Sequence, residues 1–257
     1  MQTTSDYLIN LWQHQQRCVG LPQALQPASR EEAYRVQALM EGQSVFPLQG
    51  WKIAATSVAG QKHIGVTGPL AGRYIAERVL PSGGIVPFGR NHMKVVEVEF
   101  AFRMGAELSP RNHPYTEEEV FAAVASLHPA LEFPDSRYDR FEIVGVDALI
   151  ADNACADWLV VGEAVPEIWR DMDLAAFSPV GKIAGKEDRI GLGSNVLGSP
   201  RIAMTWIANE LSSLGISLAK GQLVTTGTCV VPMAIAAQDR VVGDFGVLGR
   251  VEAVVGA

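Results

Sequence analysis

The sequence has few cysteines, no surplus of positive charge and no long apolar run. Its three cysteines, Cys18, Cys155 and Cys229, are odd in number and widely spaced, which disfavours a disulfide framework and a paired zinc-ligand pattern. The formal net charge of −7 leaves nothing to neutralise phosphates, so neither nucleic acid nor an anionic membrane is an expected partner. The most apolar stretch, 230–237, is interrupted by Pro232 and is far shorter than the roughly 20 residues of a membrane-spanning helix.

The N-terminal segment lacks the features of an export signal. It has no positively charged start, no long apolar run and no small-residue cleavage site. Because the low cysteine content also indicates a reducing compartment, we expect a cytoplasmic protein. With 48% hydrophobic residues, the 257-residue chain can form one large domain or two small ones around a sizeable core.

Capping residues and apolar spacing predict four helices. Ser29 and Glu32 form a capping box before an apolar stripe, and a second box precedes the third helix. Pro200 occupies the favoured first position of the fourth helix. The predicted helices cover residues 5–17, 30–41, 116–126 and 200–214.

Alternating and β-branched segments between these helices predict strands. They cover residues 50–56, 83–88, 94–104, 158–162 and 180–183, a short strand that runs into a turn within 128–137, and several short strands after 222. Strands and helices do not alternate as in βαβ repeats, and no glycine-rich phosphate-binding motif opens a helix after a strand. The predicted fold class is therefore α+β, around a mostly antiparallel or mixed sheet.

The strand over 94–104 carries two acids on one face. Side chains alternate along a strand, so Glu97 and Glu99 share a face and lie roughly 7 Å apart, while the opposite face is apolar. Like charges held this way inside a domain require a cation or a raised pKa. A hard divalent ion such as Mg²⁺ or Mn²⁺ meets that need with oxygen ligands. The alternative is a solvated sheet face, on which two glutamates are ordinary.

Two further charged residues lie in apolar strands. Glu132 is the lone acid of its segment, so it either faces solvent or has a cation, and it could complete a three-carboxylate site with positions left for substrate. Lys52 lies among apolar neighbours, where burial near a metal would depress its pKa and allow acid or base chemistry. The alternative for Lys52 is a side chain that reaches solvent at a sheet edge.

Other catalytic patterns are missing. The sequence has no Gly-x-Ser-x-Gly motif, its histidines have no zinc-ligand spacing, and Cys155 has no sequence-adjacent catalytic partner. His128 precedes a proline near a strand, and we expect it to be a hydrogen-bonded structural histidine.

Several segments resemble one known family in order and spacing. They are GWKIA, VEVEFAF, ALEFPDSR, ADNACADWLVVG, SPRIAMTWIANEL with GISLAKGQLVTTGT, and DFGVLGRVEA. From about residue 30 onward, the chain is similar to the 2-keto-4-pentenoate hydratase and 4-oxalocrotonate decarboxylase family of the fumarylacetoacetate hydrolase superfamily. The resemblance implies a fumarylacetoacetate-hydrolase-like mixed β-roll core with flanking helices and a small helical N-terminal region. We expect 1–48 to be that helical region and 49–257 the catalytic β-roll domain, together one compact unit that forms homo-oligomers.

The resemblance also implies a site. It implies Glu97, Glu99 and Glu132 as ligands of Mg²⁺ or Mn²⁺ and Lys52 as the catalytic residue. Our own hypothesis adds Arg137, Cys155 and Gly227 as substrate-binding residues. The implied partner is a small 2-oxo or 2-hydroxydienoic acid, whose C1 carboxylate and C2 oxygen the metal would chelate together. Charge stabilisation on that oxygen lowers the barrier to a dienolate.

The implied activity is a metal-dependent hydro-lyase reaction, the addition of water to a 2-hydroxypenta-2,4-dienoate in aromatic catabolism. The alternatives are a 4-oxalocrotonate-type decarboxylase, another C–C lyase, tautomerase or hydrolase of the superfamily, and a non-catalytic member that binds a 2-oxo acid. The superfamily's hydrolases generally use a His-Glu pair on a short lid helix. No convincing pair occurs within 60–90, which favours hydration or decarboxylation.

The chain departs from the family pattern at a few positions. Thr67 and Leu70 replace the acids of a Gly-Val-Asp-x-Pro-Asp-like stretch, where an acid is thought to cooperate with the lysine. Cys155 stands where relatives often have serine, and Gln238 replaces the glycine of a usual Gly-Asp turn.

Overall fold

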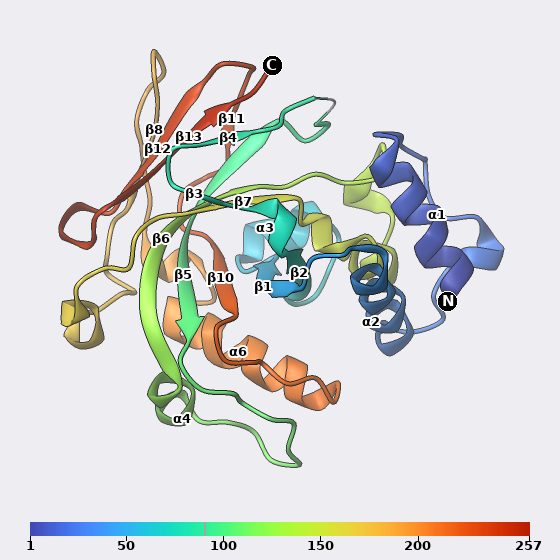
Figure 1. Cartoon of the computed structure of the whole chain (residues 1–257), viewed down its shortest axis with the longest axis horizontal. Helices are drawn as coiled ribbons and strands as arrows, with labels where there is room; N and C mark the ends of the chain where they lie inside the picture. Colours follow the sequence, from blue (N-terminus) through green and yellow to red (C-terminus); the bar gives the residue numbers. More distant parts are fainter. Residues whose placement is uncertain (90) are drawn as a thin grey trace.

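Two β-sheets form the centre of the fold in the computed structural model, which describes residues 1–89 and 91–257. The larger, eight-stranded sheet has the order β2-β1-β10-β5-β6-β7-β3, with β11 paired to β5 outside this path. The smaller sheet has the order β4-β13-β12-β8-β9. Figure 1 shows the small sheet beside the upper end of the long strands β5 and β6.

The strands of the larger sheet are β1 (Leu48–Ala54), β2 (Leu70–Ile75), β3 (Val79–Pro81), β5 (Val95–Met104), β6 (Val124–Phe133), β7 (Trp158–Val161), β10 (Leu223–Thr228) and β11 (Met233–Ala234). Those of the smaller sheet are β4 (Gly84–Val86), β8 (Val180–Ile183), β9 (Arg189–Ile190), β12 (Arg240–Asp244) and β13 (Arg250–Val255). The pairs β1–β10, β3–β7 and β4–β13 are parallel, and β5–β6 and β12–β13 are antiparallel. The predicted α+β class with a mixed sheet is confirmed.

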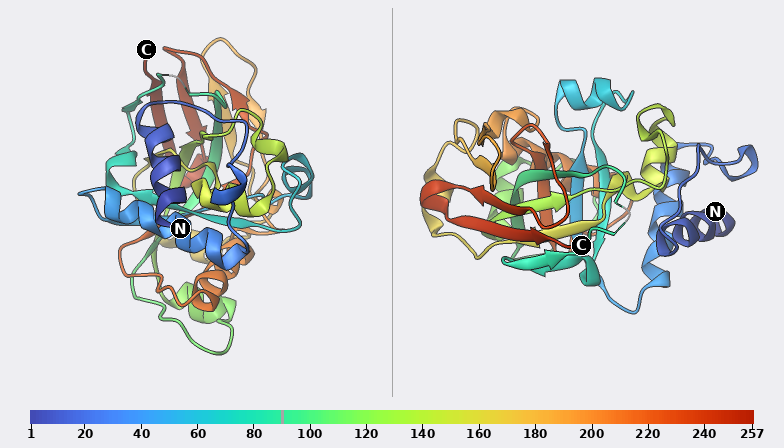
Figure 2. Two further views of the ribbon diagram at one scale, coloured as in Figure 1. Left: turned by 90° about the vertical axis from the view of Figure 1, so that its right-hand side faces the viewer. Right: turned by 90° about the horizontal axis from the view of Figure 1, so that it is seen from above.

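The helices lie outside the sheets. They are α1 (Gln2–Gln13), α2 (Arg30–Ala38), α3 (Val58–His63), α4 (Glu117–Ala122), α5 (Val146–Ala151) and α6 (Pro200–Ser213). Figures 1 and 2 show α1 and α2 together at one end of the molecule, whereas α6 lies below the larger sheet, near α4. None of the helices in the described ranges has both the length and the apolar character needed to cross a membrane.

The predicted helix starts follow from capping chemistry. The Ser29 side chain accepts a hydrogen bond from the Glu32 amide, as the capping box predicts. Both reciprocal bonds of the second box, between Thr116 and Glu119, are present. The first helix, however, begins at Gln2 and not after Ser5.

One predicted helix is wrong in length. Residues 116–126 were expected to be helical, but α4 ends at Ala122 and Val124 already begins β6. The strand pairs with β5 from Met104 onward, so tertiary strand pairing overrides the helical spacing of this segment. The strand expected within 128–137 is therefore a ten-residue strand.

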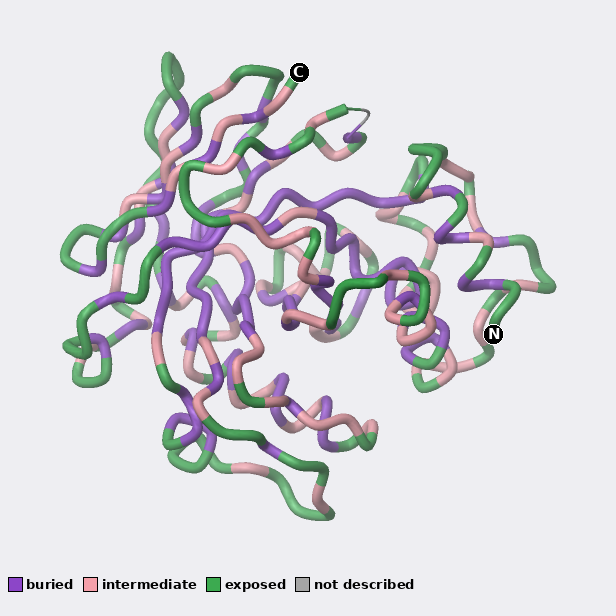
Figure 3. Tube along the Cα trace, viewed as in Figure 1, coloured by how far each residue is buried: buried purple, intermediate pink, exposed green. Residues whose placement is uncertain are grey.

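The apolar face of β5 forms part of the core. Val96, Val98, Phe100 and Phe102 are completely buried, which confirms the predicted core face of this strand. Figure 3 shows continuous burial along the central strands and exposure in the surrounding loops. The opposite face of the same strand therefore carries its two glutamates into the interior of the fold.

Candidate metal centre

Strand pairing brings the three predicted glutamates together. Glu97 on β5 is paired directly with Glu132 on the antiparallel strand β6, and Glu99 lies two residues further along the same face of β5. One ligand oxygen from each residue lies within 4.8 Å of the others. Glu99 and Glu132 are fully buried and Glu97 is half-buried. We call these residues the three-glutamate cluster.

The cluster has oxygen atoms without hydrogen-bond partners. Glu99 Oε2 accepts a hydrogen bond of 2.8 Å from the Gly227 amide, but its Oε1 and both carboxylate oxygens of Glu132 have no hydrogen bond of good geometry. Glu132 Oε1 has an ionic partner in Lys52, but Glu99 Oε1 and Glu132 Oε2 have none, and buried polar atoms are normally paired. These two oxygens indicate that a further partner belongs here. A hard divalent cation fits a set made only of carboxylate oxygens.

Lys52 is the cationic neighbour of the cluster. It lies on β1, is 3% exposed, and its Nζ is 2.6 Å from Glu132 Oε1. Nζ also donates a 3.1 Å hydrogen bond to the Ala154 carbonyl. The alternative of a lysine that reaches solvent is therefore wrong.

In the metal-free protein, the pKa of Lys52 is shifted in the opposite direction from the depression expected beside a metal. Burial lowers the pKa of Lys52, but the carboxylates of Glu132 and Glu97 more than offset burial and raise it above its usual value. Burial of Lys52 can be expected from its apolar neighbours in the sequence, whereas the number of acids around its amine depends on the fold.

The pKa values of Glu97 and Glu99 are raised, which favours the protonated carboxyl groups. Burial, followed by the nearby charge of Glu132, raises the pKa of Glu97 to about 7. The same causes raise the pKa of Glu99 well above its ordinary value. Without a cation, the cluster therefore tends to retain protons.

A strained turn places the carbonyl that receives Lys52. Asn153, Ala154 and Cys155 all have left-handed φ values, of 58°, 50° and 62°, which residues other than glycine rarely adopt. The Asn153 amide group holds this turn in place: its Oδ1 accepts from the Arg73 backbone N–H and its Nδ2 donates to the Arg73 carbonyl. We call these three residues the Asn153–Cys155 arch.

The arch also needs a small residue on β2. A Cβ atom at Gly72 would lie 2.4 Å from the Asn153 carbonyl oxygen and 2.9 Å from Lys52 Cγ. The roles of Asn153 and Gly72 were not predicted, because nothing local in either segment indicates that the two residues meet.

The structure brings Gly227 and Cys155, two predicted substrate-binding residues, to the pocket above the cluster. The Gly227 amide, however, is already bonded to Glu99. Its φ of +96° and the 2.2 Å approach of Thr56 Oγ1 to a hypothetical Cβ show why glycine is required. Burial raises the pKa of the Cys155 thiol to about 12, so this thiol is not an activated nucleophile.

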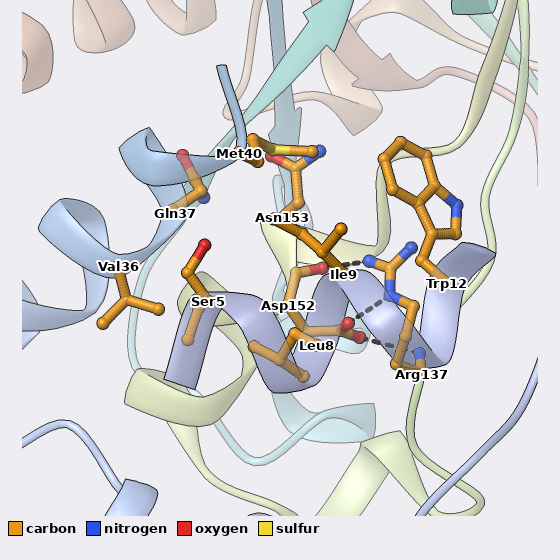
Figure 4. Close-up of a pocket in the computed structure, with 11 residues that line it drawn as sticks. Ser5, Leu8, Ile9, Trp12, Val36, Gln37, Met40, Arg137, Asp152 and Asn153 are labelled. Atoms are coloured by element: carbon orange, nitrogen blue, oxygen red, sulfur yellow. Dashed lines mark hydrogen bonds and ion pairs between the residues drawn. The ribbon is translucent and has the colours of Figure 1, made fainter. Parts of the chain in front are cut away.

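The third predicted substrate-binding residue, Arg137, lies elsewhere. Its guanidinium forms a buried ion pair with Asp152, as Figure 4 shows, and lies 5.6 Å from the centre of the Trp12 ring. Together with residues of α1, it lines a small cavity and not the pocket above the cluster. The structure therefore gives Arg137 a role in anchoring the N-terminal helix.

His128 behaves as predicted. Its Nδ1 lies 2.9 Å from the Gly162 carbonyl oxygen and its Nε2 lies 2.9 Å from Ser126 Oγ. It is buried, and it is absent from the described lining of the pocket, so it is a hydrogen-bonded structural histidine.

The pocket above the cluster has a volume of about 960 Å³. Its lining includes Lys52 and Glu97, which we call the floor, and helix α3, which forms part of the wall. Leu70 is buried in this wall at the start of β2. The pocket thus combines a charged floor with a wall of apolar and polar side chains.

Comparisons with known proteins place the chain in a family, although no protein-family model matches it. The 2-keto-4-pentenoate hydratase 1 of Dechloromonas aromatica (strain RCB) is 33% identical over 232 residues, which cover 88% of this chain and 86% of that protein. A 4-oxalocrotonate decarboxylase of Pseudomonas putida is 30% identical over 205 residues, which cover 79% of this chain and 76% of that protein.

Solved structures show the same fold. The 4-oxalocrotonate decarboxylase from Pseudomonas putida G7, complexed with magnesium and adipate, has a TM-score of 0.87 at 24% identity and covers 98% of this chain and 96% of its own. A fumarylpyruvate hydrolase from Pseudomonas aeruginosa, in complex with Mn²⁺ and pyruvate, has a TM-score of 0.61 at 17% identity, over 82% of this chain and 91% of its own. The solved structures show the fold, and the relatives at 30% identity or more show the family: the chain belongs to the 2-keto-4-pentenoate hydratase and 4-oxalocrotonate decarboxylase family.

Proposed function

We propose that this protein is a divalent-metal-dependent hydro-lyase that adds water to a 2-hydroxypenta-2,4-dienoate type of acid in aromatic catabolism. The observation that carries the proposal is the three-glutamate cluster, with ligand oxygens within 4.8 Å of one another and Lys52 bonded to one of them. The magnesium and Mn²⁺ complexes of the two structural neighbours support a divalent ion. We extend to this chain the cytoplasmic location and the homo-oligomer expected from the sequence.

Glu97, Glu99 and Glu132 would hold Mg²⁺ or Mn²⁺. Bound there, the ion would supply Lewis-acid stabilisation of negative charge on the substrate's C2 oxygen. The half-buried Glu97 is the cluster member that lines the pocket, so substrate approaches from its side.

Lys52 would hold and move the proton. Its Nζ lies between Glu132 and the Ala154 carbonyl, and the acids around it keep the amine protonated in the free enzyme. From the pocket floor it can donate a proton to the substrate's carbon chain during ketonisation. Leu70 supplies no carboxylate to assist, so proton transfer relies more heavily on Lys52 than in relatives with an acid there.

A decarboxylase is the second candidate, because the structure of a 4-oxalocrotonate decarboxylase covers 98% of this chain at a TM-score of 0.87. That enzyme's named substrate and the adipate in its complex are both dicarboxylates. The two candidates therefore differ in what the far end of the substrate carries.

Turnover of two substrates tests the proposal. With Mg²⁺, we expect the ultraviolet absorbance of 2-hydroxypenta-2,4-dienoate to fall with formation of 4-hydroxy-2-oxopentanoate, and we expect EDTA to stop the reaction. Release of CO₂ from 4-oxalocrotonate, without hydration of the dienoate, would identify the decarboxylase instead. Turnover of neither acid would contradict both candidates and favour a non-catalytic 2-oxo-acid-binding protein or another lyase, tautomerase or hydrolase.

A further inference from the structure

The pocket is large for a five-carbon acid. Its volume of about 960 Å³ is near the upper end of the roughly 300–1,000 Å³ that small-molecule sites span. The reacting carboxylate and C2 oxygen would lie at the floor, beside Lys52 and Glu97. Most of the volume therefore lies beyond the reacting atoms, where the rest of a longer substrate would extend.

The wall away from the floor is rich in apolar side chains. They come from α3 and the residues after it, from β2, from the segment around α5, and from the loops before α6 and after β10. They are Val58, Ile64, Leu70, Phe141, Leu149, Leu197, Val230 and Val231. Apolar surface buried against such a wall contributes favourably to binding, in proportion to its area.

Three polar side chains of this wall, those of Gln61, Asn195 and Thr228, already donate to backbone carbonyls. Gln61 Nε2 donates to the Ala55 carbonyl at 3.1 Å, and Asn195 Nδ2 donates to the Cys229 carbonyl at 2.8 Å. Thr228 Oγ1 likewise donates to a backbone carbonyl nearby. A second carboxylate in this region would compete with bonds that are already made.

Positive charge is also scarce along the described lining. Within it, Lys52 and His63 are the side chains that can carry positive charge. Lys52 is engaged by Glu132 at the floor, and the His63 ring packs edge-on against Phe141, with 6.0 Å between ring centres. A second carboxylate would lose hydration in this wall without an ionic partner among these residues.

Leu70 is a further apolar residue of the wall, at a position where the family resemblance implies an acid. It is 1% exposed, pairs with Ala54 at the end of β1, and lines the pocket. At the position of a family acid, the wall thus carries an apolar side chain.

We propose that this pocket accepts 2-oxo or 2-hydroxydienoic acids with an apolar alkyl or aryl tail larger than a vinyl group, and that it discriminates against dicarboxylic acids. The inference rests on the proposed function for the reacting end of the substrate. It adds the chemistry of the far end, which the three-glutamate cluster does not determine.

Binding of three analogues to the Mg²⁺-loaded protein tests this specificity. The acids are 2-oxopentanoate, 2-oxo-4-phenylbutanoate and 2-oxoadipate, measured by calorimetry with and without EDTA. We expect the phenyl acid to bind about tenfold more tightly than 2-oxopentanoate, and 2-oxoadipate to bind more weakly than either. Metal-dependent binding in which the phenyl acid has no advantage, or in which 2-oxoadipate binds most tightly, would overturn the tail specificity and leave the proposed function standing. Failure of all three acids to bind in a metal-dependent way would overturn the proposed function and this inference together.

A charge placed at the pocket rim gives a second test. Val231 is 70% exposed and lines the pocket, so Val231→Lys can be introduced without disturbing the core. We expect it to improve 2-oxoadipate binding about tenfold relative to the phenyl acid. Val247→Lys is the matched control, because Val247 is 68% exposed and lies outside the lining. Equal effects of the two substitutions, or none from Val231→Lys, would contradict the proposal.

Discussion

The net charge of four side chains at the pocket floor explains why they would bind a divalent cation or retain protons. When all four are ionised, Glu97, Glu99, Glu132 and Lys52 carry two net negative charges in a buried space. A divalent cation would neutralise this excess. In the absence of a cation, bound protons neutralise it, as the raised pKa values of Glu97 and Glu99 indicate. The residues of this site are therefore coupled, and a change at one alters the others.

Removal of one acid tests the ligand set. We expect Glu99→Gln to weaken Mg²⁺ or Mn²⁺ binding at least about tenfold, because it removes a ligand charge and keeps the side-chain volume. The melting temperature of the metal-free protein should hold or rise, since a buried like-charge interaction disappears. Calorimetry of metal binding and thermal unfolding measure both effects. Glu252→Gln, at a partly exposed position on β13, is the control, and equal metal affinity in the two variants would contradict the assignment.

Removal of the ammonium separates binding from proton transfer. We expect Lys52→Met to keep or tighten metal binding, because a positive charge leaves the neighbourhood of the carboxylates. Turnover should fall by about 10² or more if Lys52 moves the proton. Steady-state kinetics at saturating metal measure this loss. Wild-type turnover in a folded, metal-loaded variant would show that the lysine is only structural.

Metal affinity should depend on pH in a defined direction. Glu97 has a pKa raised to about 7, and the metal binds the ionised carboxylate, so binding must displace a proton below that pH. Affinity should therefore fall about tenfold from about pH 8 to about pH 6, with proton release on binding in the lower range. Calorimetry in buffers of different ionisation enthalpy measures that release. A flat profile would mean that Glu97 is not a ligand.

At the scale of the elements, local patterns predicted some parts of the site and missed others. Strict alternation on β5 predicted both the core face and the pair Glu97 and Glu99, because strand periodicity is a local property. The strand β2 was missed, since LAGRYI shows no alternation and all six of its residues are buried. The Asn153–Cys155 arch was missed for a related reason: its left-handed backbone is stabilised by bonds to Arg73, about 80 residues away in the sequence.

An irregularity in β10 positions the Gly227 amide to donate to Glu99. The register with β5 is irregular between Thr225 and Thr228, and Gly227 lies within this irregularity. We expect Gly227→Ala to destabilise the protein by about 2 kcal/mol or more and to weaken metal binding, because it strains the backbone and displaces Thr56. Denaturant unfolding and metal calorimetry measure the two effects. Gly221→Ala is the control, since Gly221 also has a positive φ but has open space around it, and its variant should keep metal affinity.

At the scale of the whole molecule, the N-terminal helices connect to the site through the β2 backbone. Gln37 on α2 donates hydrogen bonds to the Ala71 carbonyl at 2.9 Å and to the Ile150 carbonyl at 2.8 Å. Ala71 adjoins Gly72 and Arg73, which together accommodate and hold the arch above Lys52. The helical region predicted for 1–48 therefore supports the same backbone that positions Lys52.

These contacts predict that 1–48 and 49–257 unfold as one cooperative unit. Calorimetry should show a single transition whose van't Hoff and calorimetric enthalpies agree, whereas two separate transitions would mean independent domains. Gln37→Leu should lower the stability of that single transition by about 1–3 kcal/mol, because it removes the buried amide that donates to two carbonyls. Gln43→Leu, at an exposed position of the same region, should have little effect. If Gln37→Leu instead split off an early transition confined to the N-terminal helices, the region would be an accessory layer, and the path from α2 through β2 to Lys52 would not couple the two parts.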